Sequence, residues 1–446
     1  MTWAPEMTLG ELADGGRFTD GDWVESKDQD PAGSIRLTQL ADVGVGEFRN
    51  RSNRWMRPDQ AASLGCTFLH PNDILIARMP DPIGRACLAP VTIGKAVTAV
   101  DVAILRLSRP DVDPSYVMWA INSPQFHSSV LALQSGTTRK RISRKNLANL
   151  TVPVPHLNEQ RRIVDLLEDR LSRLDAADKG LALSLAKLNS LREQTIIHAL
   201  TATDVPDRVD AALADVGTAD GGLPSMPVGW SWARLGDVAE VVGGVTKDSK
   251  KQDDPSFVEV PYLRVANVQR GHLNLDTVTH IRVDPAKAKA LRLEEGDVLL
   301  NEGGDRDKLA RGWVWEGQID DCIHQNHVFR ARLNEPRLDP YFLSWTTNIF
   351  GGRWAERNGK QSVNLASISL SMIRKMPVIV PADGEAQRVV VSLHDQLASY
   401  DRLASAITES RNRGKALRRS LLTAAFSGRL LGDHADASVA EEMIHA

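Results

Sequence analysis

The chain has 446 residues, of which 42% are hydrophobic and 25% are charged, and its formal net charge is −3. This composition is typical of a folded protein of two or three domains, and it excludes wholesale disorder and a globally basic surface. Three scattered cysteines argue against a disulfide framework and suit a reducing cytoplasm, while the lack of an apolar run of about 18 residues argues against a membrane-spanning helix.

The first half of the chain begins with a mixed, strand-rich region, residues 1–155. Short apolar strand candidates lie at 73–77 and 102–107. A short helix is expected after Asp113-Pro114, because proline is permitted in the first turn of a helix. The region closes on Val152-Pro153-Val154-Pro155, where proline fixes φ and keeps the chain extended.

A long helix is predicted over residues 156–201, since residues 158–200 contain no proline. Its apolar residues recur in alternating steps of three and four, which indicates the seam of a left-handed coiled coil. A single seam would expose a long apolar stripe, so this helix needs a partner. The leucines of the seam include Leu167, Leu171, Leu174, Leu181 and Leu185.

The second half begins with a connecting segment, residues 202–228. It is rich in Ala, Asp, Gly and Pro, and we expect a linker with little core of its own. Another strand-rich region follows at 229–381, with strand candidates near 297–300 and 327–330. A second long helix is predicted over 382–430, and residues 431–446 are expected to form a frayed tail.

The second long helix offers the partner that the first one needs. Its middle is poorer in apolar residues, because Arg411 and Gly414 occupy seam positions. We expect the two helices to pair antiparallel within one chain, and we expect Asp178, on the first seam, to approach Arg411 and help to fix the register. The apolar residues of the second seam include Leu393, Leu397 and Ile407.

The second half repeats the first at an offset of about 226 residues. A constant offset over so long a stretch indicates the duplication of whole domains. We therefore expect an α+β fold, in which two mixed globular regions with a pseudo-twofold relation are joined by two long antiparallel coiled-coil helices. The matching stretches include Leu9-Gly10-Glu11-Leu12 with Leu235-Gly236-Asp237-Val238, Asp113-Pro114 with Asp339-Pro340, and Ile142-Ser143 with Ile368-Ser369.

Positive charge is concentrated in short stretches of both regions. Five of the seven residues from 139 to 145 are Lys or Arg, and neighbouring Thr and Ser can donate hydrogen bonds to phosphate. Arg fits phosphate or a guanine edge because its guanidinium donates two parallel hydrogen bonds. Another cluster lies at 49–57, and the corresponding loop of the second region, 353–364, combines Arg with base-reading amides. The candidate DNA contacts are Arg49, Arg51, Arg54, Arg57, Thr137, Thr138, Arg139, Lys140, Arg141, Arg144, Lys145, Asn267, Gln269, Arg306, Lys308, Arg353, Arg357, Lys360, Gln361 and Asn364.

Motifs for catalysis are absent from the sequence. It contains neither the Gly-x4-Gly-Lys-Ser/Thr phosphate loop nor the Gly-x-Gly-x-x-Gly fingerprint. Asp339-Pro340-Tyr341-Phe342 has one proline where amino-methyltransferases have two. The stretch from Cys322 to His327 offers donors for zinc but no second ligand pair, so packing or polar contacts explain it better. We expect no catalytic residue and no metal site.

Four stretches make the chain resemble the specificity subunit of bacterial type I restriction–modification systems. Two are helix starts, NEQRRI at 158–163 and GEAQRV at 384–389. The others are the entry into the second region, LPSMPVGWSWARLGDV at 223–238, and the end of the distal helix, LLTAAFSGRL at 421–430. The resemblance covers nearly the whole chain, and the order and duplication of the motifs are its specific part.

This resemblance implies a non-catalytic subunit whose two target-recognition domains, 1–155 and 229–381, each read one half of a bipartite, gapped site in double-stranded DNA. The helix pair would set the gap and dock two methyltransferase (modification) subunits, with the seam leucines involved. Those subunits would bind S-adenosylmethionine and methylate adenine, and restriction/translocase subunits using ATP and Mg would cleave unmodified DNA. No cofactor is expected on this chain itself. The stretches 136–145 and 359–369 would carry the DNA-contact role.

Two alternative functions can be set against this one. A non-DNA scaffold would carry two carbohydrate- or peptide-binding regions on a coiled coil, and it would show no salt-dependent binding to duplex DNA. A free-standing nuclease or methyltransferase would need the catalytic motifs that the sequence lacks.

Overall fold

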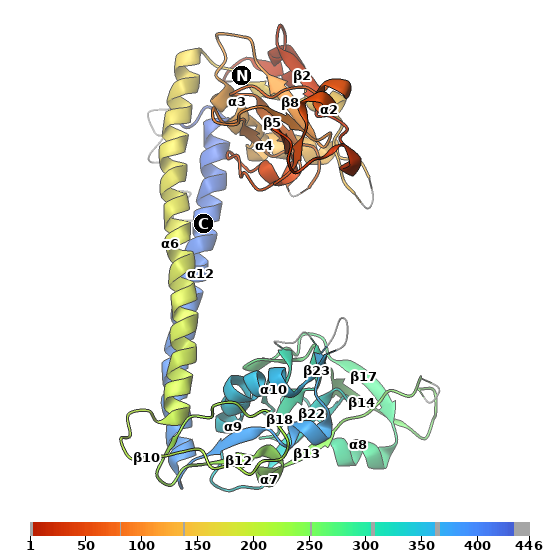
Figure 1. Ribbon diagram of the computed structural model, residues 1–446, viewed down its shortest axis with the longest axis vertical. Coiled ribbons are helices and arrows are strands. Elements are labelled where there is room, and N and C mark those ends of the chain that lie inside the picture. The colour runs from red at the N-terminus through yellow and green to blue at the C-terminus, as the bar shows by residue number, and fades with distance from the viewer. Residues whose placement is uncertain are drawn as a thin grey trace. The chain divides into compact units, whose positions relative to one another are not determined.

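The computed structural model describes residues 3–80, 82–136, 139–249, 252–304, 308–361 and 366–431 (Figure 1). The chain forms two compact units. Unit 1 combines the chain up to Leu183 with the chain from Ala406 onward, and unit 2 is Ser184–Ser405. Each unit contains a globular region of short helices and strands together with segments of two long helices. The α+β fold expected from the sequence is therefore confirmed.

The globular region of unit 1 is built on two small sheets. One is antiparallel with the strand order β2-β8-β5-β6, and the other, β4-β3-β7, pairs β3 with β7 in parallel. A ladder of β1 with β9 joins the start of the region to its end. The strands are β1 (Glu6–Thr8), β2 (Arg17–Asp20), β3 (Ile35–Thr38), β4 (Trp55–Met56), β5 (Ile74–Ala77), β6 (Ala86–Leu88), β7 (Ala96–Thr98), β8 (Val102–Arg106) and β9 (Thr151–Pro153).

Short helices pack on these sheets. The predicted helix after Asp113-Pro114 is α3, and the Asp113 carboxylate accepts hydrogen bonds from the first N–H groups of that helix. Tyr116 of α3 is fully buried in the same core as Ile74 and Ile76 of β5. The helices are α1 (Leu9–Leu12), α2 (Pro58–Ser63), α3 (Pro114–Ile121), α4 (Pro124–Ala132) and α5 (Arg144–Ala148), with 3-10 turns η1 (Ser26–Asp28) and η2 (Leu40–Asp42).

The globular region of unit 2 repeats this topology. Its antiparallel sheet has the order β13-β22-β18-β20, its second sheet, β17-β14-β21, pairs β14 with β21 in parallel, and β12 pairs with β25 as β1 does with β9. The corresponding strands are β12 (Ser231–Arg234), β13 (Ala239–Gly243), β14 (Val258–Leu263), β17 (Thr279–Val283), β18 (Val298–Asn301), β20 (Gly312–Val314), β21 (Ile323–His324), β22 (Val328–Leu333) and β25 (Pro377–Val380).

Unit 2 also carries elements beyond these sheets. Helix α9 continues through the π-helical turn η5 into α10, where unit 1 has a break between α3 and α4. The remaining elements are β10 (Arg208–Val209), β11 (Met226–Pro227), β15 (Val268–Gln269), β16 (His272–Leu273), β19 (Gly303–Gly304), β23 (Lys360–Gln361), β24 (Ala366–Ser367), α7 (Leu235–Val238), α8 (Pro285–Leu291), α9 (Pro340–Thr346), η5 (Thr347–Gly351), α10 (Gly352–Asn358) and α11 (Leu370–Ile373).

Matched hydrogen bonds confirm the internal repeat. Asn122 exchanges hydrogen bonds with the backbone of Ala86, at 2.8 and 3.0 Å, and Asn348 does the same with Gly312, at 2.8 and 3.1 Å. Both members of each pair are shifted by 226 residues, which is 348 − 122 and 312 − 86. Asp339 caps α9 just as Asp113 caps α3. Asn122 and Asn348, and likewise Asp113 and Asp339, are thus identical residues that make the same bonds in the two halves.

The two long helices, α6 (Leu157–Thr201) and α12 (Glu385–Ala425), pair antiparallel within each unit. In unit 1, Leu167 and Leu171 of α6 share a core with Leu421 near the end of α12. In unit 2, Leu200 at the end of α6 shares a core with Leu393 near the start of α12. Of the remaining predicted seam residues, Leu397 and Ile407 are buried, and Leu174, Leu181 and Leu185 are partly buried.

Helix α12 is continuous through its poorer middle. Arg411 donates from Nε and Nη2 to the two carboxylate oxygens of Asp178, at 2.8 and 3.3 Å. The predicted approach of these two seam residues is therefore confirmed. Beside them lies a cavity of about 480 Å³ whose lining includes Leu174, Gly414 and Leu417. No helix in the described part of the chain is long and apolar enough to cross a membrane.

Candidate nucleic-acid interface

The first basic loop is a tight hairpin in unit 1. The backbones of Ser135 and Arg141 exchange two hydrogen bonds of 2.8 Å each, and Gly136 adopts φ +97°, a conformation that favours glycine. Arg139, Lys140 and Arg141 are exposed, and none of the three side chains has an ionic partner among the described residues. Thr137 and Thr138 lie outside the described residues. The hairpin thus carries three uncompensated cations.

The base of this hairpin is fixed to the sheet. The Ile142 N–H donates to the Arg78 carbonyl at 3.0 Å, and Arg78 Nε donates back to the Ile142 carbonyl at 3.1 Å. Ser143 then caps α5. The guanidinium of Arg144 already donates one hydrogen bond within the protein, to the Phe18 carbonyl at 3.0 Å. Lys145 is exposed. Arg78, which the sequence did not single out, is therefore the residue that holds the loop in place.

The second copy has its loop at the same point. Ser369 caps α11 by accepting from the Met372 N–H, and Ser143 caps α5 by accepting from the Asn146 N–H, which is the same bond shifted by 226 residues in both partners. The preceding strands, in the order β19-β24-β23, frame the loop. Lys360 is exposed at its start. The predicted contacts Arg306 and Asn364 and the side chain of Gln361 lie outside the described residues.

The second basic cluster, residues 49–57, is organised by a buried carboxylate. Asp42 is fully buried and accepts hydrogen bonds from the backbone N–H groups of Arg51, at 2.6 Å, and Ser52, at 2.8 Å. The cations themselves differ in availability. Arg51 is exposed, with no side-chain partner among the described residues. The others contact Glu47 (Arg49, 3.2 Å), Gln29 (Arg54, 2.8 Å) and Asp59 (Arg57, 3.2 Å).

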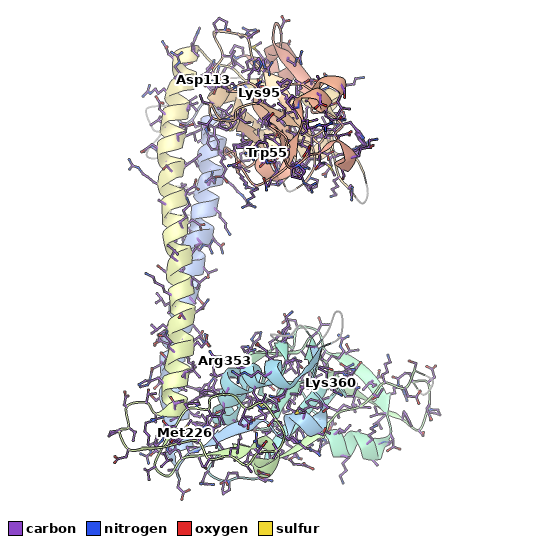
Figure 2. All side chains as sticks on the ribbon, in the orientation of Figure 1. Trp55, Lys95, Asp113, Met226, Arg353 and Lys360 are labelled. Atoms are coloured by element: carbon purple, nitrogen blue, oxygen red, sulfur yellow. The ribbon has the colours of Figure 1, made fainter. Side chains whose placement is uncertain are left out.

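The predicted DNA contacts on α10, Arg353 and Arg357, are exposed, and both also bind other residues of the protein. Figure 2 labels Arg353 and Lys360 on this globular region. Arg353 forms an ion pair of 2.9 Å with Glu193 of α6. Arg357 donates to the backbone carbonyl of Asp220 at 3.1 Å. Lys308 is half-buried and lies against Gly304 of β19.

Asn267 serves the fold of unit 2. It is only 4% exposed, and its amide donates to the carbonyls of Asn274 and Thr277, each at 2.9 Å, while its oxygen accepts from the Arg264 N–H at 2.9 Å. Because its donors and its oxygen are all used inside the protein, we leave Asn267 out of the interface. Gln269 is half-buried and donates to the Ala266 carbonyl at 2.7 Å.

The stretch from Cys322 to His327 is occupied by packing and polar contacts. His324 is fully buried, and Nδ1 lies 2.6 Å from the Val328 carbonyl, while burial lowers the pKa of its imidazole to about 4. Burial also raises the pKa of the Cys322 thiol to about 12, which disfavours the thiolate that zinc needs. His327 pairs with Glu302 at 2.5 Å. Among the described residues, no three His, Cys, Asp or Glu side chains are grouped to hold a metal ion.

Comparison with known proteins gives the context of these loops. Residues 65–181 match the family model of the Type I restriction modification DNA specificity domain. The type I restriction enzyme StySPI specificity subunit of Salmonella potsdam is 22% identical over 326 residues, covering 72% of this chain and 67% of that protein. The EcoBI specificity subunit of Escherichia coli is 21% identical over 312 residues, covering 69% and 64%. The chain thus spans about two thirds of the length of these relatives.

Two solved structures share the fold. A chain from a structure concerned with complex assembly and conformational transition of the type I R-M system has a TM-score of 0.70 at 18% identity, covering 96% of this chain and 98% of that one. The HsdS subunit from Thermoanaerobacter tengcongensis has a TM-score of 0.51 at 16% identity, covering 96% and 97%. The chain is thus similar in sequence to specificity subunits of type I restriction–modification systems, the resemblance that its sequence predicts, and its residues 65–181 match the model of the DNA specificity domain of that family.

Proposed function

We propose that this chain is the non-catalytic DNA-recognition subunit of a type I restriction–modification complex, and that each globular region reads one half of a bipartite, gapped site. One observation carries the proposal. A loop that the sequence marks as a DNA contact precedes a serine cap, Ser143 or Ser369, at equivalent positions of the two copies. A duplicated contact loop suits a site with two halves.

The affinity of the first region for DNA would come mainly from its hairpin. Arg139, Lys140 and Arg141 are exposed and form no ion pair within the described part of the chain, so each can replace a counterion at a phosphate. Phosphate contacts orient a protein on the duplex, whereas base edges supply the sequence preference. The forked guanidinium of Arg serves both purposes, and it matches the two acceptors of guanine in the major groove.

The helix pair would set the distance between the half-sites and dock two modification subunits. Helix α6 has 45 residues, so it is about 68 Å long at a rise of about 1.5 Å per residue. It begins in unit 1 and ends in unit 2, and α12 runs the opposite way. We infer that S-adenosylmethionine, ATP and Mg belong to the partner subunits, which would methylate adenine and cleave unmodified DNA.

Duplex binding at two salt concentrations tests this proposal. The complex of this chain with its modification subunit should bind a duplex that contains its site, and the affinity should fall steeply between 50 and 200 mM salt, by at least about tenfold for a few phosphate contacts. The same complex should prefer this duplex to one with a scrambled sequence. Binding without salt dependence, or without sequence preference, would contradict the proposal and favour a scaffold that does not read DNA.

A further inference from the structure

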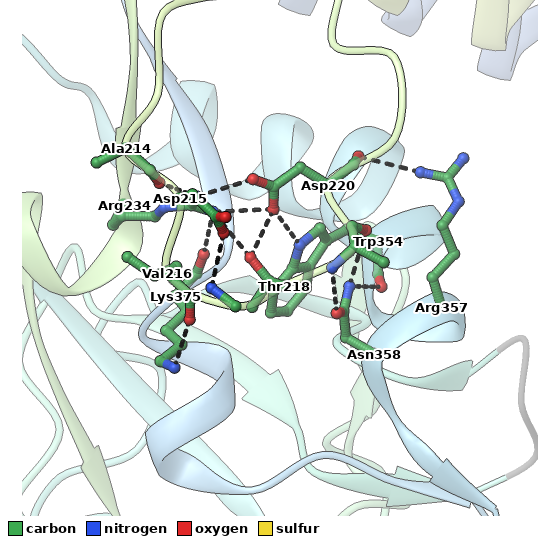
Figure 3. Close-up of polar contacts among 12 residues, drawn as sticks. Ala214, Asp215, Val216, Thr218, Asp220, Arg234, Trp354, Arg357, Asn358 and Lys375 are labelled. Atoms are coloured by element: carbon green, nitrogen blue, oxygen red, sulfur yellow. Dashed lines mark hydrogen bonds and ion pairs between the residues drawn. The ribbon is translucent and has the colours of Figure 1, made fainter.

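The segment between the two halves is docked onto the second globular region along residues 214–220, which we call the strap (Figure 3). The Ala214 carbonyl accepts a hydrogen bond of 2.6 Å from Arg234, and the Val216 carbonyl accepts one of 2.8 Å from Lys375. The strap is thus hydrogen-bonded along a defined path, whereas its composition suggested a linker with little core of its own.

Asp220 is the central residue of the strap. Its two carboxylate oxygens accept hydrogen bonds of 2.9 and 2.8 Å from Arg234, and Oδ1 also accepts from Trp354 Nε1 at 2.9 Å. Arg234 is 6% exposed and Trp354 1% exposed. Hydrogen bonding to Arg234 lowers the pKa of Asp220, so the carboxylate is ionised at neutral pH. Without Asp220, Arg234 would be a buried cation lacking its counter-ion, which is costly.

The strap holds one helix in particular, α10, because Trp354, Arg357 and Asn358 all belong to it. The side-chain amide of Asn358 accepts from the Ala219 N–H at 2.8 Å and donates to the Ala219 carbonyl at 3.1 Å. Gly221 has φ +72°, and a Cβ atom there would lie 2.1 Å from Arg357 Nη1. The chain therefore passes directly against this guanidinium, and the positive φ at this point favours glycine.

Helix α10 leads straight into the second contact loop. It ends at Asn358, and β23 begins two residues later at Lys360. The first copy lacks the residues that make these contacts, since the positions 226 residues before Arg234, Trp354 and Asn358 are Thr8, Ser128 and Ala132. These strap contacts are thus specific to the second copy. They are made to α10, and the end of α10 sets where the second contact loop starts.

We propose that Asp220 is a positioning residue for DNA recognition by the second globular region: Arg234 of β12 fixes its carboxylate, and the carboxylate holds α10 through Trp354, which sets where the contact loop begins at Lys360. This inference rests on the proposed function. It predicts that neutralising Asp220 weakens DNA binding. Simple electrostatics predicts the opposite change in affinity, because removing a negative charge from a DNA-binding protein should strengthen its attraction to phosphate. A weaker complex after neutralising Asp220 therefore reports positioning.

Asp220→Asn and Asp210→Asn form a matched pair for the test. Both substitutions remove one negative charge from the same segment, and Asp210 is exposed. Each variant is assembled with the modification subunit, and affinity is measured for duplexes with both half-sites intact or with one of them scrambled. The methylated motif of the wild-type complex supplies the half-sites, and Lys360→Ala identifies the half read by the second region.

The expected result is confined to one half-site. Asp220→Asn should lose about tenfold in affinity for the intact duplex, the weight of one good contact. It should also discriminate about tenfold less against scrambling of the second half-site, while its discrimination at the first half-site stays as in the wild type. Asp210→Asn should bind at least as tightly as the wild type. Asp220→Glu, which restores the charge, should recover part of the loss.

Asn358→Ala covers the case in which Asp220→Asn unfolds, as judged by thermal denaturation. It removes both bonds to Ala219 without stranding a buried charge, and it should cause a smaller loss at the same half-site. Wild-type binding by both variants, or an equal loss at both half-sites, would overturn the positioning role. If the wild-type complex itself shows no sequence preference, the proposed function fails instead.

Discussion

The hairpin of unit 1 gives the sharpest prediction about affinity. Arg139, Lys140 and Arg141 are exposed and have no acidic partner in the described part of the chain. If each neutralises one phosphate, replacing all three with alanine should reduce the slope of log affinity against log salt by about 2.7, since each contact contributes about 0.9. Over a fourfold rise in salt, the wild type should therefore lose about 40-fold more affinity than the variant.

Fluorescence anisotropy of a labelled duplex at 50, 100 and 200 mM salt measures this slope for the complex with the modification subunit. A triple alanine variant at Arg17, Lys95 and Arg109 changes the net charge equally outside both basic clusters. Sedimentation of the two complexes shows whether assembly is intact. An unchanged slope in the hairpin variant, or an equal change in the control, would refute the assignment of the hairpin to phosphate binding.

Three further predictions concern the helix pair and the repeated core. Hydrogen bonding to Arg411 lowers the pKa of Asp178 below its ordinary value of 3.8, so the pair should stabilise the fold at neutral pH and lose this effect as pH falls through the lowered pKa. The Tm of the wild type should therefore exceed that of Asp178→Asn at pH 7, and the difference should vanish in acid. A Tm difference that stays constant with pH would contradict this prediction. Asn348→Ala should lower the free energy of unfolding by about 2–3 kcal/mol in urea denaturation, because the N–H and carbonyl of Gly312 lose a buried partner. Asn122→Ala, its counterpart in unit 1, should lower the free energy of unfolding by a similar amount. Wild-type stability of both variants would contradict a stabilising role for these matched hydrogen bonds. A seven-residue insertion in both α6 and α12 adds about 10 Å, so the gap in the methylated motif should widen by about three base pairs; an unaltered gap would refute the role of the helices as a spacer.

The duplicated parts of the fold could be predicted because the repeated residues are those that make the repeated bonds. Asp113 and Asp339 stand at the same offset as the helices they cap. Asp178 and Arg411 could be paired from their seam positions alone, because heptad spacing fixes which residues face the partner helix. The same pair bridges α6 and α12 at the poorer middle of α12.

The contacts that escaped prediction depend on how the chain folds and not on a repeated or periodic pattern. Asn267 looked like a base-reading amide, and only the fold shows that it satisfies the backbone of Asn274 and Thr277. An Asp-rich segment resembles a linker by composition, yet Asp220 binds Trp354, which is 134 residues away. No local pattern encodes such a partner, since burial and pairing of polar groups are decided by tertiary structure.

Mapping methylated adenines in cells tests the central claim most directly. Cells carrying the modification subunit are compared with and without this chain, and with the alanine variants of the first hairpin and of Lys360. The account predicts adenine methylation at one bipartite, gapped motif that appears only with this chain, with each variant relaxing a different half. An unchanged methylation pattern, or a single continuous motif affected equally by both variants, would contradict it.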